Sequence, residues 1–334
     1  MKKKKPARAD TPALALLYNF DRMEHKKFID LHVDLVSHVR DGDASQTNME
    51  AVRKNNRLFF ASVFIDPKRA SVPAKIHECI KTDIAWYRGL EKSAFVTIST
   101  KTDLVDMQAS QKTGFILHVE GADALTPQTE NYLEEWANLG LRSLGLVWNA
   151  DNALATSAAS FKERIGLSDF GKQIVQKLNN LHVIIDLAHI NERGFYDVLE
   201  ISTVPPIVTH GNSYVLAPHP RNFTDEQLVA LRDAGGIVGV FFSGKYINPS
   251  GSPTIDDVVR HILHIVEVAG VDTVAIGSDF GGITSGLVSG LEHVDRMNDL
   301  ARKLAEVGVS NGDRERIFYG NVSRYLERHF QNHA

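Results

Sequence analysis

The sequence has little cysteine and no long apolar run, and both absences narrow the class of protein. Cys79 is the only cysteine among the 334 residues, so an internal disulfide and zinc sites built from cysteine thiolates are excluded. A single cysteine is also typical of a reducing compartment, and we therefore expect a cytoplasmic protein. No stretch of about 18 apolar residues occurs, so no transmembrane helix and no membrane partner are expected.

Two further absences exclude common kinds of partner. The formal net charge is −4, whereas a nucleic-acid-binding protein usually carries a basic surplus. No G-x-G-x-x-G fingerprint follows the first apolar strand, which disfavours dinucleotide binding. The lysines at 2–5 are followed by no apolar core of a signal peptide, so we expect residues 1–11 to form a flexible tail and residues 12–334 to form a single domain.

Short apolar runs alternate with helical patterns along most of the chain. Runs with the composition of strands buried on both faces are typical of parallel sheets, and helices between them indicate α/β architecture. Eight such strands favour a (β/α)8 TIM-type barrel over an open sheet. The predicted strands are 28–35, 58–65, 115–121, 142–148, 183–189, 206–210, 236–242 and 273–279. The predicted helices are 73–92, 127–139, 168–181, 191–202, 224–234, 255–268, 290–307 and 311–329.

Metal-binding residue types recur at the carboxyl ends of these predicted strands. Side chains two apart on a strand share one face, so His32 and Asp34 point the same way. In a barrel, all the carboxyl strand ends meet at one mouth, where catalytic groups lie. So many uncompensated charges in one pocket would be costly, and cations would remove that cost. The residues concerned are His32, Asp34, Glu120, His189, His210 and Asp279.

This set of residues is larger than the three protein ligands of a typical mononuclear catalytic zinc. It matches the ligand requirement of two ions about 3.5 Å apart better than that of a single ion. Glu120 lies between the first-strand pair and the two later histidines around the ring, which makes it the natural bridge. A hydroxide shared by the two ions is then the expected nucleophile, with Asp279 as general base and acid. The ligand chemistry accepts Zn²⁺, Mn, Co or Fe.

The motifs DLHVDL, VEGADAL, IIDLAHI, IVTHGN, HPRN and GSDFGGI resemble the membrane dipeptidase (renal dipeptidase) family of the amidohydrolase superfamily, in order from about residue 28 to residue 325. The resemblance implies a dinuclear zinc enzyme that hydrolyses dipeptides, including those with a C-terminal D-residue. It assigns His32 and Asp34 to one Zn²⁺ ion, and His189 and His210 to the other.

The same resemblance assigns roles to the remaining residues of the site. It makes Glu120 the bridge and Asp279 the proton shuttle. Arg221 matches the arginine that grips the substrate carboxylate, a role that suits a bidentate guanidinium. We also expect Trp148 and Asn149 to line the substrate site, and the Pro/Gly/Ser-rich segments 66–73 and 243–254 to cover it.

The chain departs from the family pattern at two positions. Trp148 stands where mammalian members have a substrate-contacting histidine, and Gly281 stands where the family usually has a second acid. Both departures bear on substrate preference rather than on the proposed metal ligands. His118 and Asp186 lie near the ligands, but we interpret them as an interior histidine and a structural acid.

Three functions therefore remain open at this point: a dipeptidase, a hydrolase of N-acyl amino acids or other small amides, and a binding protein without catalysis. A barrel whose metals are bridged by a carboxylated lysine is disfavoured because residues 141–148 contain no lysine. A deaminase would more often show His-x-His on its first strand. The oligomeric state is not fixed by the sequence, and a homodimer is left open.

Overall fold

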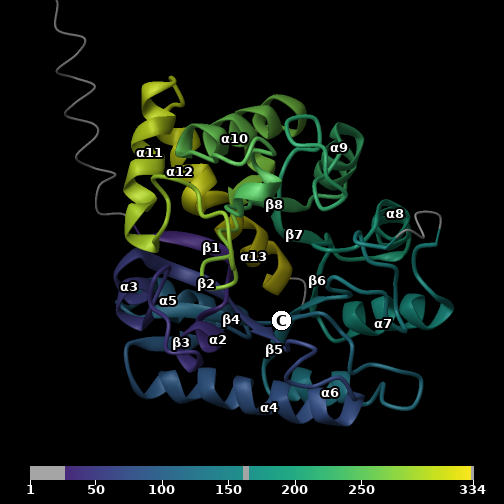
Figure 1. Ribbon diagram of the computed structural model, residues 1–334. Helices are drawn as coiled ribbons and strands as arrows, with labels where there is room; N and C mark the ends of the chain where they lie inside the picture. The colour runs from purple at the N-terminus through teal and green to yellow at the C-terminus, as the bar shows by residue number, and fades with distance from the viewer. Residues whose placement is uncertain (1–26, 161–164, 332–334) are drawn as a thin grey trace, which may run out of the picture.

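The computed structural model describes residues 27–160 and 165–331. All nine strands within these ranges run parallel, and eight of them close into a barrel because β9 pairs with both β8 and β1, while β2 pairs with both β1 and β4. The predicted TIM-type barrel is therefore confirmed (Figure 1). The barrel strands are β1 (Phe28–Val33), β2 (Asn56–Phe64), β4 (Thr113–Glu120), β5 (Leu141–Gly145), β6 (Ile184–Asp186), β7 (Ile207–Gly211), β8 (Ile237–Val240) and β9 (Val274–Ile276).

Helices surround these strands on the outside, as Figure 1 shows. Several begin with a side-chain cap; Ser168, Asn191 and Thr224 each accept a backbone N–H of the first helical turn. The apolar faces of the helices pack on the outward side chains of the strands to form the larger core. The helices are α4 (Pro73–Gly89), α6 (Tyr132–Asn138), α7 (Asp169–Asn180), α8 (Glu192–Ile201), α9 (Asp225–Asp233), α10 (Ile255–Ala269) and α11 (Met297–Glu306).

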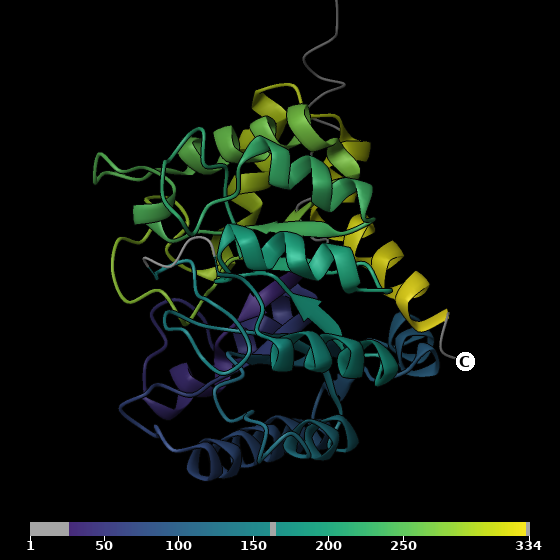
Figure 2. The ribbon, with the colours of Figure 1, turned by 90° about the vertical axis from the view of Figure 1, so that its right-hand side faces the viewer.

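The last helix, α13 (Asn321–Gln331), closes the end of the barrel at which the strands begin. Its buried face, which includes Tyr325 and Phe330, joins a second core made of the inward side chains of the barrel strands. The Tyr325 hydroxyl donates to the carbonyl of Pro205, just before β7. Figure 2 shows α13 on one side of the barrel and the long loops that follow the strands on the other. The open mouth is therefore the one where the strands end.

Several short elements were not predicted. Between the predicted helix 73–92 and the predicted strand 115–121, the structure contains β3 (Phe95–Thr97) and α5 (Lys101–Ala109). β3 pairs with the beginning of β4, whereas β5 pairs with β4 only from Leu117 onward, so β3 extends the sheet outside the barrel. Two short helices, α2 (Leu35–Arg40) and α3 (Met49–Asn55), connect β1 to β2. Such short elements contain too few residues to show a periodic apolar pattern.

The C-terminal helices begin or divide at points that the sequence pattern did not reveal. The predicted helix 290–307 starts only at a 3-10 turn, Val294–Arg296, before α11. The predicted helix 311–329 is divided into α12 (Asn311–Glu315), a π-helical turn (Arg316–Gly320) and α13. In the described ranges, no helix is both long and apolar enough to cross a membrane. Residues 1–11, predicted as a tail, lie outside the described residues, and the division of the chain into domains stays a prediction.

Candidate metal centre and substrate pocket

The six residues singled out from the sequence meet at the open mouth of the barrel. His32 belongs to β1, Glu120 ends β4 and His210 belongs to β7. The other three, Asp34, His189 and Asp279, follow the ends of β1, β6 and β9 within three residues. The structure thus gathers side chains that are far apart in the sequence, because the carboxyl ends of parallel strands converge in a closed barrel.

Two groups of ligand atoms face the two oxygens of Glu120. On one side, Nε2 of His32 lies 3.7 Å from Glu120 Oε2, 3.3 Å from Asp34 Oδ2 and 3.6 Å from Asp279 Oδ1. On the other side, Glu120 Oε1 lies 2.9 Å from His189 Nε2 and 3.6 Å from His210 Nε2. The two oxygens of Glu120 thus face different neighbours, His32 on one side and His189 on the other, so each oxygen is placed to contribute to metal binding.

Tight backbone connections hold the ends of β1 and β9 together. The N–H of Asp279 donates to the carbonyl of His32 at 3.1 Å, and the N–H of Asp34 donates to the carbonyl of Phe280 at 2.9 Å. Asp279 and His189 have φ angles of 64° and 67°, in the left-handed region that side chains rarely adopt. Such strain persists at positions where the surrounding structure fixes the chain, and it is concentrated at functional sites.

The electrostatics of the cluster reflect a surplus of buried acids. Burial opposes the charged form of His32, but the neighbouring Glu120 and Asp34 carboxylates override it and raise the pKa of the imidazole to about 10. Burial raises the pKa of Glu120 to about 7, despite the opposing charge of His32. Burial and the neighbouring Asp34 raise the pKa of Asp279 well above its ordinary value. Metal ligands bind in their deprotonated forms, so a cation bound among these groups would counteract the raised pKa values.

The residues present fit a metal site. Both ring nitrogens of the fully buried His32 lack a hydrogen-bond partner in the described part of the chain, which is unusual for a buried imidazole. Two sets of atoms have the spacing of metal ligands, all within 4.8 Å of one another: His32, Glu120 and His210 form one, and His32, Asp34 and Asp279 form the other. The donors are nitrogens and carboxylate oxygens, which suit zinc.

Because Gly282 has no side chain, it leaves room for the carboxylates of Asp34 and Asp279. A Cβ at this position would lie 2.5 Å from Asp279 Oδ1 and 2.6 Å from Asp34 Oδ2, closer than side-chain atoms approach one another. Gly281 has a φ of 92°, and a Cβ there would lie 2.8 Å from the carbonyl oxygen of Asp34. Its N–H donates to the side chain of Gln46 at 3.0 Å. The backbone at 281 is thus shaped for glycine, the residue that departs from the family pattern.

Neighbouring polar groups orient the histidines that could bind metal. His189 Nδ1 lies 3.0 Å from Asn149 Oδ1, and His210 Nδ1 lies 3.0 Å from the Thr209 hydroxyl. With Nδ1–H of His189 donating to Asn149, Nε2 is left with its lone pair toward the cluster. Asn149 was predicted only as a residue that lines the substrate site, and the structure gives it this additional contact.

Asp186 and His118 lie one layer below the cluster, as the sequence led us to expect. Asp186 accepts the backbone N–H and the hydroxyl of Thr209, which ties the end of β6 to β7. His118 Nδ1 contacts the hydroxyl of Ser143 at 3.0 Å, and its Nε2 lies 3.6 Å from Asp186. Both residues therefore contribute to the interior of the barrel rather than to the mouth.

The sequence reading missed Asp30, a fully buried acid within β1. Asp30 accepts the backbone N–H of His32 at 3.2 Å, the N–H of Ser278 at 2.9 Å and the hydroxyl of Ser278 at 2.6 Å. Burial raises its pKa to about 6, although the bonds from Ser278 act in the opposite direction. Asp30 thereby fixes β1 beside the end of β9. Its one visible signal was an acid in the middle of an otherwise apolar strand.

A cavity of about 290 Å³ opens above the cluster. Arg221 projects into it, is only 3% exposed, and has its Nε and Nη2 atoms without hydrogen-bond partners among the described residues. Its guanidinium carbon lies 5.9 Å from the centre of the Tyr246 ring. Trp148 lines the same cavity, with its ring 4.6 Å from that of Phe64. Both predicted covering segments contribute to the wall, through Asp66 in one and Ser243, Lys245 and Tyr246 in the other.

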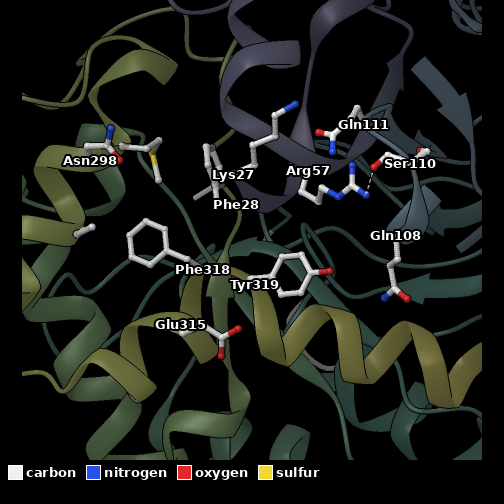
Figure 3. Close-up of a pocket in the computed structure, with 12 residues that line it drawn as sticks. Lys27, Phe28, Arg57, Gln108, Ser110, Gln111, Asn298, Glu315, Phe318 and Tyr319 are labelled. Atoms are coloured by element: carbon white, nitrogen blue, oxygen red, sulfur yellow. Dashed lines mark hydrogen bonds between the residues drawn. The ribbon is translucent and has the colours of Figure 1, made fainter. Parts of the chain in front are cut away.

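A larger cavity, of about 500 Å³, lies at the opposite end of the barrel (Figure 3). Phe28 and Arg57 line it from the beginnings of β1 and β2, and Phe318 and Tyr319 line it from the π-helical turn. The Arg57 guanidinium is already bonded to backbone carbonyls, including that of Ser110. This cavity contains none of the convergent acids and histidines. In barrel enzymes the active site lies at the carboxyl ends of the strands, so we assign the site to the smaller cavity.

Known proteins of one family resemble this chain. The model of the family described as membrane dipeptidase (peptidase family M19) matches residues 21–333. The uncharacterised dipeptidase C965.12 of Schizosaccharomyces pombe is 38% identical over 202 residues, which are 59% of this chain and 48% of the yeast protein. An uncharacterised protein from the pqqA 5' region of Klebsiella pneumoniae is 33% identical over 225 residues, 65% of this chain and 82% of that protein. The match thus spans about half the length of the yeast relative.

A solved structure shares the fold. The crystal structure of a metallopeptidase from Rhodobacter sphaeroides, liganded with a phosphinate mimic of the dipeptide L-Ala-D-Ala, superposes with a TM-score of 0.82. The superposition covers 90% of this chain and 99% of that one, at 23% sequence identity.

Proposed function

The chain belongs to the membrane dipeptidase family, peptidase family M19, and from this membership we propose that it is a dinuclear zinc dipeptidase. The observation that carries the proposal is the position of Glu120, whose Oε2 lies beside His32 and whose Oε1 lies beside His189. One zinc ion would be held by His32 and Asp34 and the other by His189 and His210, with Glu120 shared between them. Bound zinc would polarise the scissile carbonyl and generate a nucleophile from water at neutral pH.

Arg221 is proposed to bind the C-terminal carboxylate of the substrate. Its guanidinium is buried and lacks a counter-ion among the described residues, which is costly unless a ligand supplies one. Burial lowers its pKa, but an arginine remains charged in proteins. A bidentate pair with a carboxylate would fix the orientation of the substrate above the cluster. A cavity of about 290 Å³ is at the small end of ligand pockets, which suits a dipeptide.

Asp279 is proposed to move the proton. Its carboxylate faces the cavity and lies beside the first group of ligand atoms, 3.6 Å from His32 Nε2. From this position it can accept the proton of the attacking water and deliver it to the leaving amine. Burial raises the pKa of this carboxyl group, which makes it a stronger base than an exposed aspartate.

The Rhodobacter sphaeroides protein was crystallised with a mimic of a dipeptide that ends in a D-residue, which supports including such substrates. The proposal is tested by assaying the zinc-loaded protein against L-Ala-L-Ala, L-Ala-D-Ala and N-acetyl-alanine, together with elemental analysis of the purified protein. We expect two zinc ions per chain and turnover of dipeptides. Turnover of the acylated amino acid alone would assign the site to small-amide hydrolysis, and metal binding without turnover would indicate a binding protein.

A substitution at Asp279 tests the assigned role directly. Asp279→Asn should retain its zinc and lose about 10²–10⁴-fold in kcat, the usual contribution of a general acid–base group. Asp233→Asn, which changes an exposed carboxylate on α9, is the matched control and should retain full activity. Unchanged turnover in Asp279→Asn would remove this residue from the mechanism.

The remaining expectations complete the proposal. We place the protein in the cytoplasm, because its one cysteine is consistent with a reducing environment. Its partner is a small molecule rather than a nucleic acid, since the net charge is −4. A homodimer is left open, and gel filtration with light scattering decides between a monomer and a homodimer.

A further inference from the structure

A second cation lines the substrate cavity beside Arg221. Lys245 belongs to the short 3-10 helix Gly244–Tyr246, which follows β8. Its Nζ lies 4.5 Å from the centre of the Tyr246 ring, and the guanidinium carbon of Arg221 lies 5.9 Å from the same centre. The two positive charges are therefore separated by no more than the sum of these distances. Aromatic faces attract cations, so one ring helps to hold both side chains at the cavity.

The charge of Lys245 is available to a ligand. In the described part of the chain no ion pair involves this residue, and its side chain is exposed at the cavity wall. The charge of Lys245 nevertheless acts on a group that the charge of Arg221 also affects. Burial lowers the pKa of His219, and the positive charges of Arg221 and Lys245 lower it further. The His219 ring in turn lies 4.7 Å from that of Tyr246.

A simple dipeptide offers only one carboxylate, and the proposed function assigns that group to Arg221. We infer that Lys245 recognises a second carboxylate, so that the preferred substrates are dipeptides whose C-terminal residue is Asp or Glu. This inference rests on the proposed function. In this arrangement the C-terminal residue of the substrate binds Arg221 through its main-chain carboxylate and directs its side chain toward Lys245. In glutamate the two carboxyl carbons are separated by four C–C bonds, roughly 5 Å when extended, which lies within the upper limit on the separation of the two cations.

The test compares two substrates that differ in one charge. We expect the zinc-loaded protein to hydrolyse Ala-Glu with a kcat/KM about fivefold above that for Ala-Gln, the upper range for an ion pair at a solvent-exposed site. Lys245→Met should reduce this ratio to about one, and Lys245→Glu should invert it. Lys101→Met, on an exposed lysine of α5 far from the cavity, is the control and should keep the wild-type ratio. The preference for Ala-Glu should become smaller when the salt concentration is raised from about 0.15 M to about 1 M, because screening weakens the attraction to Lys245.

A binding measurement separates this inference from the proposed function. Calorimetry on zinc-loaded Asp279→Asn gives the Kd of Ala-Glu and Ala-Gln without turnover. We expect the same fivefold preference, lost when Lys245→Met is added. Dipeptide turnover with a ratio that does not depend on Lys245 would overturn this inference alone. Absence of any dipeptide turnover by the wild-type protein would overturn the proposed function, and the calorimetric ratio would then decide the role of Lys245 by itself. Absence of binding of both dipeptides to Asp279→Asn would overturn the inference.

Discussion

Replacing Gly282 by alanine should damage the site far more than it damages the fold. The added Cβ would lie 2.5 Å from Asp279 Oδ1 and 2.6 Å from Asp34 Oδ2. Both contacts involve the tips of side chains, so the carboxylates can turn away at little cost in stability. The backbone at 282 is not in the left-handed region, and alanine adds no strain there. Relief of the overlap needs a movement of roughly 0.5–1 Å, beyond the tolerance of a catalytic constellation.

A displacement of this size typically costs about 10²-fold in rate, equivalent to about 2.7 kcal/mol of transition-state stabilisation. We therefore expect kcat/KM of Gly282→Ala to fall by about 10²-fold on L-Ala-L-Ala, with lower zinc occupancy by elemental analysis. The free energy of unfolding from urea titration should change by less than about 1 kcal/mol.

Gly89→Ala is the matched control for this substitution. A Cβ at Gly89 would meet nothing within 4 Å, so activity and zinc content should both stay at the wild-type level. If Gly282→Ala retained wild-type kcat/KM and zinc content, the packing of these two carboxylates around the glycine would not be what fixes the site. A large loss of stability would instead show that the loop cannot relax.

Two further outcomes follow from the structure. Gly281→Asp, which restores the acid usual in the family, should lower the free energy of unfolding by about 1–2 kcal/mol and not raise kcat/KM, because φ is 92° and the Cβ would press on the carbonyl of Asp34. Gly281→Asn should cost less in urea titrations, because Asn tolerates this conformation better. Burial lowers the pKa of His261 to about 4, so the unfolded chain, with an ordinary pKa of about 6.5, binds the proton first as pH falls. Stability should therefore drop by about 2 kcal/mol from this group between pH 7 and pH 5, and His261→Gln should lose that part of the pH dependence.

Each of these outcomes has a result that would contradict it. A Gly281→Asp variant as stable as wild type would show that the loop adopts another backbone conformation at no cost. Equal acid sensitivity of the wild type and His261→Gln would show that the imidazole is not held neutral. Its neutral form is required by the two contacts it makes, as acceptor from the N–H of Ser213 and as donor to the carbonyl of Ile247.

The strand positions and the six convergent side chains could be predicted from the sequence. Buried parallel strands are continuous apolar runs, and this local signal located all eight barrel strands to within a few residues. His32, Glu120 and His210 lie in those strands, so the convergence of parallel strand ends was enough to bring them together. The short strand β3 was missed because three residues carry no period.

Only the tertiary structure decided which residues of the covering loops line the site. Tyr246 and Lys245 reach the cavity, and Gly282 makes room for two carboxylates, through loop paths that no residue pattern encodes. The left-handed backbone at His189 and Asp279 is likewise set by contacts with other strands rather than by the residues themselves. The physical reason is range. A buried strand can be recognised from its own run of apolar residues, whereas the path of a loop depends on the segments it packs against, which in a barrel are far away in the chain.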